Sequence, residues 1–252
     1  MEDRELLKRV EDLCRRSERT GRVTSTAFLT PAERMQLQTA LHPGYGTRMC
    51  FFGGYEECER SIAVFLPEED LGAGTEMPEN VKALVSAVHF RAFFGKPGHR
   101  DYLGALLASG ISRDRLGDIL ISGTEATVFC MPGIRAHLLT VDRIGRVSVR
   151  AEEISLDAVQ IPRKEKKEKT FSVMSMRLDA VAAGMFNLSR TACARLITEG
   201  NVSLNYSICM RTDAAVDVGD VISLRGRGKG KVSGLGGSSR KGRQFVEVEI
   251  YV

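Results

Sequence analysis

The sequence contains no tryptophan and only four histidines among its 252 residues. The histidines are far apart, and the six cysteines form no C-x-x-C pair. A zinc site needs several such ligands at short spacings, so this pattern argues against a resident metal. It also predicts reduced thiols that mostly pack in a core, and no disulfide framework.

Long apolar stretches are also missing. No run of 18 apolar residues is present, which excludes a membrane-spanning helix. Residues 1–9 are charged and polar, so we expect no secretory signal. These absences predict a cytoplasmic protein without a membrane partner.

Positive charge is concentrated in the last third of the chain. Residues 163–252 contain 16 Lys and Arg against 9 Asp and Glu, whereas the whole chain has a net charge of only +4. Between Asp220 and Glu247 there are seven basic residues and no acidic one. A concentrated basic field is typical of a protein that binds a polyanion, although a solvated basic loop is the alternative.

The first of three predicted segments spans residues 1–75 and forms an N-terminal α/β domain. Apolar residues recur at helical spacing in residues 6–14, and Gly21 ends this helix. Thr30-Pro31-Ala32-Glu33 has the form of a capping box and predicts a second helix through Ala40. Residues 49–52 and 62–66 are predicted strands.

The second segment, residues 76–162, is predicted to have the order β-α-β-β-α-β. The predicted strands are residues 81–90, 118–122, 125–130 and 146–151, and the predicted helices are residues 100–109 and 132–141. This split βαβ order is that of an RRM-like domain, but many enzymes share it, so the topology alone does not define a function.

Residues 163–173 are predicted to form a charged linker, because the run beginning at Arg163 is too polar to pack. The third segment then spans residues 174–252. It contains predicted helices at 177–184 and 189–199, and strands at 202–204, 221–224 and 245–251. The overall prediction is an α+β protein with three modules.

The third segment resembles the S4 RNA-binding domain. The matching residues are Arg177-Leu178-Asp179, Leu188-Ser189-Arg190-Thr191, Arg195-Leu196-Ile197, Gly200 to Asn205, and Val218 to Ile222. One departure is the pair Asn205-Tyr206, where the family usually has Asn-Gly, and it predicts a turn of different shape. The resemblance implies that this segment binds structured RNA.

The chemistry of these residues agrees with the resemblance. Ser189 at an N-cap leaves the N–H groups of the first helical turn facing outward, where they attract phosphate. Arg190 and Arg195 lie about 140° apart around this helix and can flank an RNA strand. The alternatives are that Arg177 and Asp179 only cap their helix, and that Arg190 only forms a surface ion pair.

The predicted RNA-binding residues form two groups. The first group follows the S4 motif and comprises Arg177, Ser189, Arg190, Thr191, Arg195 and Asn205. The second adds non-specific affinity and comprises Arg225, Arg227, Lys229, Lys231, Arg240, Lys241 and Arg243.

The upstream segments resemble the YlmH family. The matching residues are Phe28 to Glu33, Phe52 to Tyr55 with Glu59-Arg60, His99 to Gly104, and Gly117-Asp118-Ile119. This resemblance implies binding to rRNA of the large ribosomal subunit and to its stalled peptidyl-tRNA. It also implies a role in ribosome-associated quality control, a link to cell division, and an RNA contact through Arg190.

No catalytic motif accompanies these features. The Gly-Arg-Lys run at 225–231 fails the phosphate-loop spacing, because Gly230-Lys231 is followed by Val232. We therefore predict a non-enzymatic RNA-binding factor without cofactor, metal or small-molecule substrate. The alternatives are an RNA-modifying enzyme and a cell-division adaptor with incidental RNA binding. Oligomeric state is left open.

Overall fold

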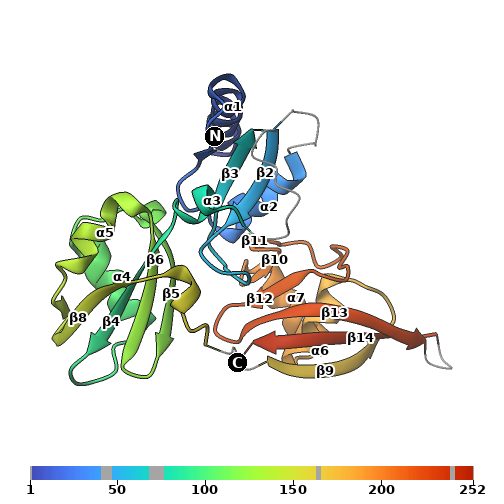
Figure 1. Cartoon of the computed structure of the whole chain (residues 1–252). Coiled ribbons are helices and arrows are strands. Elements are labelled where there is room, and N and C mark those ends of the chain that lie inside the picture. Colours follow the sequence, from blue (N-terminus) through green and yellow to red (C-terminus); the bar gives the residue numbers. More distant parts are fainter. Residues whose placement is uncertain (1, 41–46, 68–76, 163–165, 239–241, 252) are drawn as a thin grey trace. The chain divides into compact units, whose positions relative to one another are not determined.

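The computed structural model describes residues 2–40, 47–67, 77–162, 166–238 and 242–251 (Figure 1). The chain divides into two compact units, Met1–Pro162 and Arg163–Val252. Both units combine helices with antiparallel sheets, which confirms the α+β class.

The N-terminal part of the first unit is a three-stranded sheet with two helices. Its elements are α1 (Glu2–Thr20), β1 (Thr24–Ser25), α2 (Pro31–Ala40), β2 (Thr47–Phe52) and β3 (Ile62–Pro67), and the sheet order is β1-β3-β2. The predicted capping box is present at α2. The Thr30 amide donates to Glu33 Oε2 at 2.6 Å, and the Glu33 amide donates to Thr30 Oγ1 at 3.2 Å.

Strand β3 is buried along its whole length because both of its faces are covered. On one face, Ala63 and Phe65 pack in a cluster with Val10 of α1 and Leu37 of α2. On the other face, alternate residues of β3 pack against the following part of the chain. A strand buried on both faces is continuously apolar, as residues 62–66 are.

The middle part of the first unit is a five-stranded antiparallel sheet in the order β5-β6-β4-β8-β7. Its elements are α3 (Glu79–Lys82), β4 (Ser86–Ala92), α4 (His99–Ala108), a 3₁₀ turn (Arg113–Arg115), β5 (Leu116–Ser122), β6 (Glu125–Cys130), α5 (Pro132–Leu139), β7 (Arg143–Ile144), β8 (Val147–Ile154) and a 3₁₀ turn (Leu156–Ala158). Helices α4 and α5 cover one face through residues such as Tyr102, Leu106 and Leu138.

The predicted strand at residues 81–90 is wrong in its first half. Residues 79–82 form the short helix α3, and the strand begins at Ser86. Val81 is fully buried in the cluster shared with the N-terminal part, so its apolar character serves a helical packing contact. The other helices and long strands follow the predicted order, and the two-residue strand β7 between α5 and β8 was not predicted.

The second unit is a six-stranded antiparallel sheet with two helices on one face. Its elements are β9 (Lys166–Val173), α6 (Leu178–Phe186), α7 (Arg190–Thr198), β10 (Val202–Leu204), β11 (Ser207–Ile208), β12 (Val221–Leu224), β13 (Gly228–Ser238) and β14 (Gln244–Tyr251). The order is β11-β10-β12-β13-β14-β9. Val181 and Ile197 from the helices pack on Val232 and Val248 from the sheet.

The charged linker predicted at residues 163–173 is not supported for its described part. Residues 166–173 form β9, which pairs with β14 along all eight of its residues. Phe171 and Val173 contact the core, while Lys166, Lys167 and Glu168 are exposed on an edge strand, where charged side chains remain in water. Residues 163–165 lie outside the described part.

The turn at Asn205-Tyr206 also differs from the prediction. Asn205 has φ +51° and Tyr206 has φ +67°, and they join β10 to β11 as a two-residue hairpin loop. Positive φ at both central residues is the requirement that Asn-Gly usually meets in such a hairpin. Tyr206 therefore adopts the backbone conformation in which the family usually has glycine.

Candidate nucleic-acid interface

Asp179 lies in the first turn of α6 and holds two arginines. Its carboxylate accepts hydrogen bonds from Arg190 Nη2 at 2.6 Å and from Arg177 Nε at 3.2 Å. Burial alone would raise the pKa of Asp179, but the hydrogen bonds and charges of Arg190 and Arg177 outweigh burial and lower it. We call these three residues the Asp179 clamp.

The clamp leaves its arginines available to a ligand. The side chain of Asp179 is only 9% exposed, whereas those of Arg177 and Arg190 are 42% and 57% exposed. Arg190 therefore does form the ion pair considered as an alternative, and much of its side chain still faces solvent. An arginine fixed on one side by a buried carboxylate is preorganised for a second anion.

Helix α7 begins beside the clamp. Ser189 is its N-cap and accepts a hydrogen bond from the Ala192 amide at 3.1 Å, as predicted. The amides of Arg190 and Thr191 then have no acceptor within the helix, which is the general arrangement at a helix N-terminus that attracts phosphate. Ser189 and Thr191 are both exposed.

Arg195 lies further along α7. Its side chain is 74% exposed and pairs with Glu199 at 3.6 Å, which is an ordinary surface contact between residues four apart. The structure thus places Arg195 on the same helix as Arg190 but outside the clamp.

Arg211 is a cation near the clamp that sequence reasoning missed. The loop that carries it lies against the start of α6, because the Asp179 amide donates to the Thr212 carbonyl and the Leu178 amide donates to the Ala214 carbonyl. The Arg211 side chain is 77% exposed and pairs with Asp213 at 3.5 Å. No motif marks it in the sequence, since its position depends on backbone contacts across more than 30 residues.

Asn205 is engaged within the fold. Its Nδ2 donates to Asp220 Oδ1 at 2.8 Å, and its Oδ1 accepts from the Val221 amide at 3.0 Å. These bonds tie the β10–β11 hairpin to the start of β12. The predicted role of Asn205 in RNA contact thus competes with two intramolecular hydrogen bonds.

The second predicted group lies apart from the clamp. Arg225 and Arg227 are exposed in the turn before β13, and Lys229 and Lys231 alternate with the core residues of that strand. Lys229 and Lys231 therefore face away from α6 and α7, whose residues pack on the core side of this strand. Lys229 Nζ lies 5.5 Å from the centre of the Tyr251 ring.

Arg243 is the one remaining member of this group that the structure describes, and it precedes β14. Arg243 is exposed and donates to the Ser172 carbonyl at 2.8 Å. Arg240 and Lys241 lie outside the described residues.

The YlmH-like motifs of the first unit meet at Asp118. Its carboxylate accepts hydrogen bonds from Tyr55 Oη at 2.7 Å, from the Glu59 amide at 2.7 Å and from the Arg60 amide at 3.0 Å. Burial, followed by the charge of Asp118, raises the pKa of Tyr55. We call this set of contacts the Asp118 joint.

Arg60 completes the joint. Its side chain is buried and donates to the carbonyls of Leu116 at 3.1 Å and Phe28 at 2.9 Å. Burial, partly offset by nearby carboxylates, lowers the pKa of Arg60. These motif residues therefore connect the N-terminal and middle parts.

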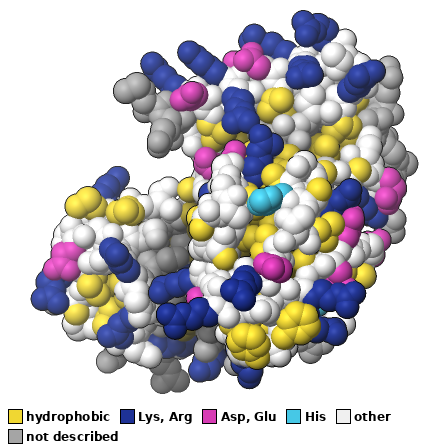
Figure 2. Space-filling view, turned by 90° about the vertical axis from the view of Figure 1, so that its left-hand side faces the viewer, with side chains coloured by type: hydrophobic (Ala, Val, Ile, Leu, Met, Phe, Trp, Pro, Cys, Tyr) yellow, Lys and Arg dark blue, Asp and Glu magenta, His cyan; other side chains and the backbone are white. Residues whose placement is uncertain are grey.

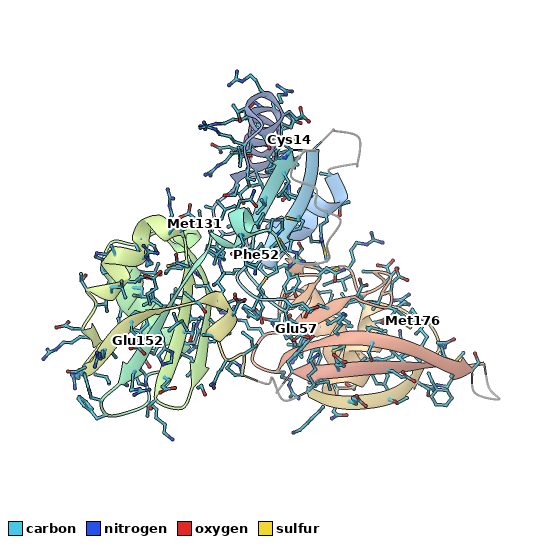
Figure 3. All side chains as sticks on the ribbon, viewed as in Figure 1. Cys14, Phe52, Glu57, Met131, Glu152 and Met176 are labelled. Carbon is cyan, nitrogen blue, oxygen red and sulfur yellow. The ribbon has the colours of Figure 1, made fainter. Side chains whose placement is uncertain are left out.

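The glycines of these motifs permit close packing. A Cβ on Gly117 would lie 2.7 Å from the Phe28 ring, and a Cβ on Gly54 would lie 2.4 Å from the Phe129 ring. Phe52 and Met131 belong to the same buried region between the two parts (Figure 3). The motifs thus have a structural explanation that needs no ligand.

Among the described residues, no group of three or more His, Cys, Asp or Glu side chains is placed to hold a metal ion. Within the same part of the chain, no helix has the length and apolar character required to cross a bilayer.

Two family models match the chain. The model described as "YlmH, N-terminal" matches residues 2–69, and the model described as "Putative RNA-binding domain in YlmH" matches residues 78–158. A curated relative, "Ribosome-associated protein quality control protein P2" of Bacillus subtilis (strain 168), is 29% identical over 229 residues, covering 90% of this chain and 87% of the relative. The chain belongs to the YlmH family.

A solved structure shares the fold. "Cell division protein ylmH from Streptococcus pneumoniae" aligns with a TM-score of 0.51 and 20% identity, covering 64% of this chain and 96% of that chain. At this identity the likeness concerns the fold alone.

Proposed function

We propose that this protein is a non-enzymatic RNA-binding factor of the ribosome. Its second unit, which we assign as an S4 domain, docks on structured rRNA and tRNA of the large subunit. The middle part of the first unit is an RRM-like domain. The protein acts in the cytoplasm on subunits that carry a stalled peptidyl-tRNA, in ribosome-associated quality control.

The Asp179 clamp is the observation that carries this proposal. It presents Arg177 and Arg190 beside the N-terminus of α7, where backbone amides add partial positive charge. Arginine forks and helix N-termini are both ordinary ways to hold RNA phosphates. The matched family and the name of the Bacillus subtilis relative support the ribosome as the source of that RNA.

The basic residues outside the clamp supply a second contribution. Arg225, Arg227, Lys229, Lys231 and Arg243 form a field without base-specific geometry. If about five to seven phosphates are neutralised in total, affinity falls steeply as salt rises. Each of these residues then contributes less than Arg190 and mainly affects the salt dependence.

Sedimentation with dissociated ribosomal subunits tests the proposal. The wild type is expected to migrate with the large subunit at low salt and to be released at high salt. Arg190→Ala is expected to weaken binding by roughly 1–3 kcal/mol if its contact with RNA is base-specific or bidentate.

Arg15→Ala is the matched control. Arg15 is an exposed arginine that pairs with Glu11 at 3.8 Å, so this substitution also removes one positive charge from a surface ion pair. It should bind as the wild type does. Equal binding by Arg190→Ala and the wild type would reject the role of the clamp.

If the protein stays at the top of the gradient at every salt concentration, the ribosome is rejected as the target. The enzyme alternative is then tested by incubating the protein with RNA and measuring nucleoside composition, which a binder leaves unchanged. If the protein is instead an adaptor in cell division, the Arg190→Ala variant should bind its protein partner as tightly as the wild type does.

A further inference from the structure

Two adjacent phenylalanines are exposed in the middle part of the first unit. Phe93 is 69% exposed and Phe94 is 57% exposed, in the loop between β4 and α4. Single exposed apolar residues are common, but two neighbouring aromatic rings in water indicate a binding surface.

The backbone holds this loop beside the start of β8. The Phe93 amide donates to the Ser148 carbonyl at 3.1 Å, which extends the β4–β8 pairing beyond Ala92. Phe93 therefore continues the alternation of β4 on the side where His89 and Arg91 lie, opposite helices α4 and α5.

Most of the charge around the phenylalanines is positive. Lys96 is in the same loop, Arg143 begins β7, Arg146 is in the β7–β8 turn, and Arg150 is directly opposite Arg91 in the sheet. Arg91 and these four basic residues are all exposed. Of these five cations, only Arg91 forms an ion pair with a described residue, with Glu125 at 3.0 Å. The acidic residues of this face, Glu125 and Glu152, lie opposite Arg91 and His89, nearer the centre of the sheet. In the view of Figure 2, hydrophobic side chains at the lower edge have Lys and Arg side chains around them.

Among the described residues, the centre of the same sheet face offers no exposed Phe, Tyr or Trp ring. The His89 imidazole lies there, but its side chain is only 17% exposed and contacts Thr127 Oγ1 at 3.3 Å and the Glu125 carboxylate at 3.8 Å. His89 and Thr127 face each other on the central strands, and Phe129 is buried under the N-terminal part, where it stacks on Tyr55 at 5.1 Å. Base stacking on this domain thus has to occur at the end of the sheet, where Phe93 and Phe94 lie.

We propose that Phe93 and Phe94 form a stacking site for unpaired RNA bases, with Lys96, Arg146 and Arg150 holding the adjoining phosphates. Aromatic rings combined with a basic surface are the usual means of binding single-stranded nucleic acid. The surrounding cations favour this ligand over an apolar protein segment, because they match its charge. The site deepens the proposed RNA-binding function and rests on it, but it is separate from the Asp179 clamp.

Binding of a labelled oligoadenylate of about ten nucleotides, measured by fluorescence anisotropy with the full chain, tests this site. The double variant F93A/F94A is expected to lose roughly 5- to 150-fold in affinity if one base stacks. An RNA duplex hides all base faces except those of its two terminal pairs, so its affinity should change much less in this variant.

Three further variants separate stacking from simple apolar contact. F93Y/F94Y keeps both rings and should bind as the wild type does, whereas F93L/F94L keeps an apolar surface without rings and should bind as weakly as F93A/F94A. Leu107→Ala removes another exposed apolar side chain, on α4, and should have no effect.

The outcomes are distinguishable. Wild-type affinity of F93L/F94L overturns the stacking site, and so does wild-type affinity of F93A/F94A. If Arg190→Ala still weakens ribosome binding in that case, the proposed function stands without this second site. If F93A/F94A does not weaken oligoadenylate binding and Arg190→Ala does not weaken ribosome binding, both proposals fail.

Discussion

A carboxylate as buried as Asp179 is costly to ionise unless cations face it. Arg177 and Arg190 meet this requirement, and the pKa of Asp179 is lowered as a result. The same contacts restrict the arginine side chains before any ligand arrives. One acidic residue therefore contributes both to the stability of the second unit and to the geometry of the proposed interface.

Asp179→Asn is expected to lower the free energy of unfolding at pH 7 by about 1–3 kcal/mol, because two charge-assisted hydrogen bonds are weakened. The pKa of Asp179 is lower in the folded state, so its contribution is fully present above the unfolded value, roughly 3.9. It is lost as pH falls through the folded-state pKa. Urea titrations at pH 7 and at acid pH measure this; a difference between wild type and variant that does not shrink on acidification contradicts the assignment.

The roles of residues that depend only on neighbouring sequence could be predicted. Ser189 precedes a helix and has the side chain of an N-cap, so its role followed from sequence alone. The hydrogen bond between Arg190 and Asp179 could not be predicted in this way, because it joins two different helices. Phe93 and Phe94 were missed as well, since a Phe-Phe pair after a strand is equally consistent with burial.

At the scale of elements, Lys169 connects β9 to the end of α6. Its ammonium donates to the carbonyls of Gly184 and Met185 and to Asn187 Oδ1. Helices leave their last carbonyls without partners, and a cation there is favourable. Burial lowers the pKa of Lys169, as expected for an ammonium drawn towards a core.

Lys169→Met keeps the aliphatic stem and removes the donor. We expect a loss of about 1–2 kcal/mol in unfolding free energy, because the end of α6 loses its cap. Lys167→Met on the same strand is the control, since Lys167 is exposed. Chemical denaturation of both variants decides the matter: equal stability would show that Lys169 does not anchor α6.

Element boundaries followed the sequence where chemistry is local. The Thr30–Glu33 capping box marks the start of α2, and residues 125–130 and 221–224 form strands at the predicted bounds. Strand β9 was missed because its charges suggested a tether. Its partner strand β14 is more than 70 residues away in the sequence, and no local pattern indicates such a partner.

At the scale of the whole chain, the Asp118 joint makes two sheets into one compact unit. Three donors from the segment after β2 converge on a single carboxylate of β5. These donors are partly buried, and donors shielded from water lose more from an absent partner than the bond itself contributes. Folding of the N-terminal and middle parts should therefore be coupled.

Asp118→Ala is expected to destabilise the first unit by about 2–5 kcal/mol, because the Tyr55 hydroxyl and two amides lose their acceptor. Tyr55→Phe is the graded comparison: it keeps the ring on Phe129 and removes one hydrogen bond, for about 1–2 kcal/mol. Hydrogen exchange in β2, β3 and β5 reports the coupling. Faster exchange in β5 alone would show that the joint does not couple the parts.

The joint could not be derived from sequence. Its hydrogen bonds connect residues 58 to 63 positions apart, and the motifs that mark it are equally compatible with a ligand site. Only the geometry shows that their polar groups satisfy one another. This is why the resemblance identified the family while the role of these motifs required the structure.

Strand β9 has a further consequence for behaviour in concentrated solution. Among the described strands it is the outermost of its sheet and pairs only with β14, so its other edge is a template for a strand from another molecule. The exposed residues Lys166, Lys167 and Glu168 make such an addition costly, since an incoming copy would have to desolvate and juxtapose these charges. The run of charges thus protects the chain from edge-to-edge aggregation.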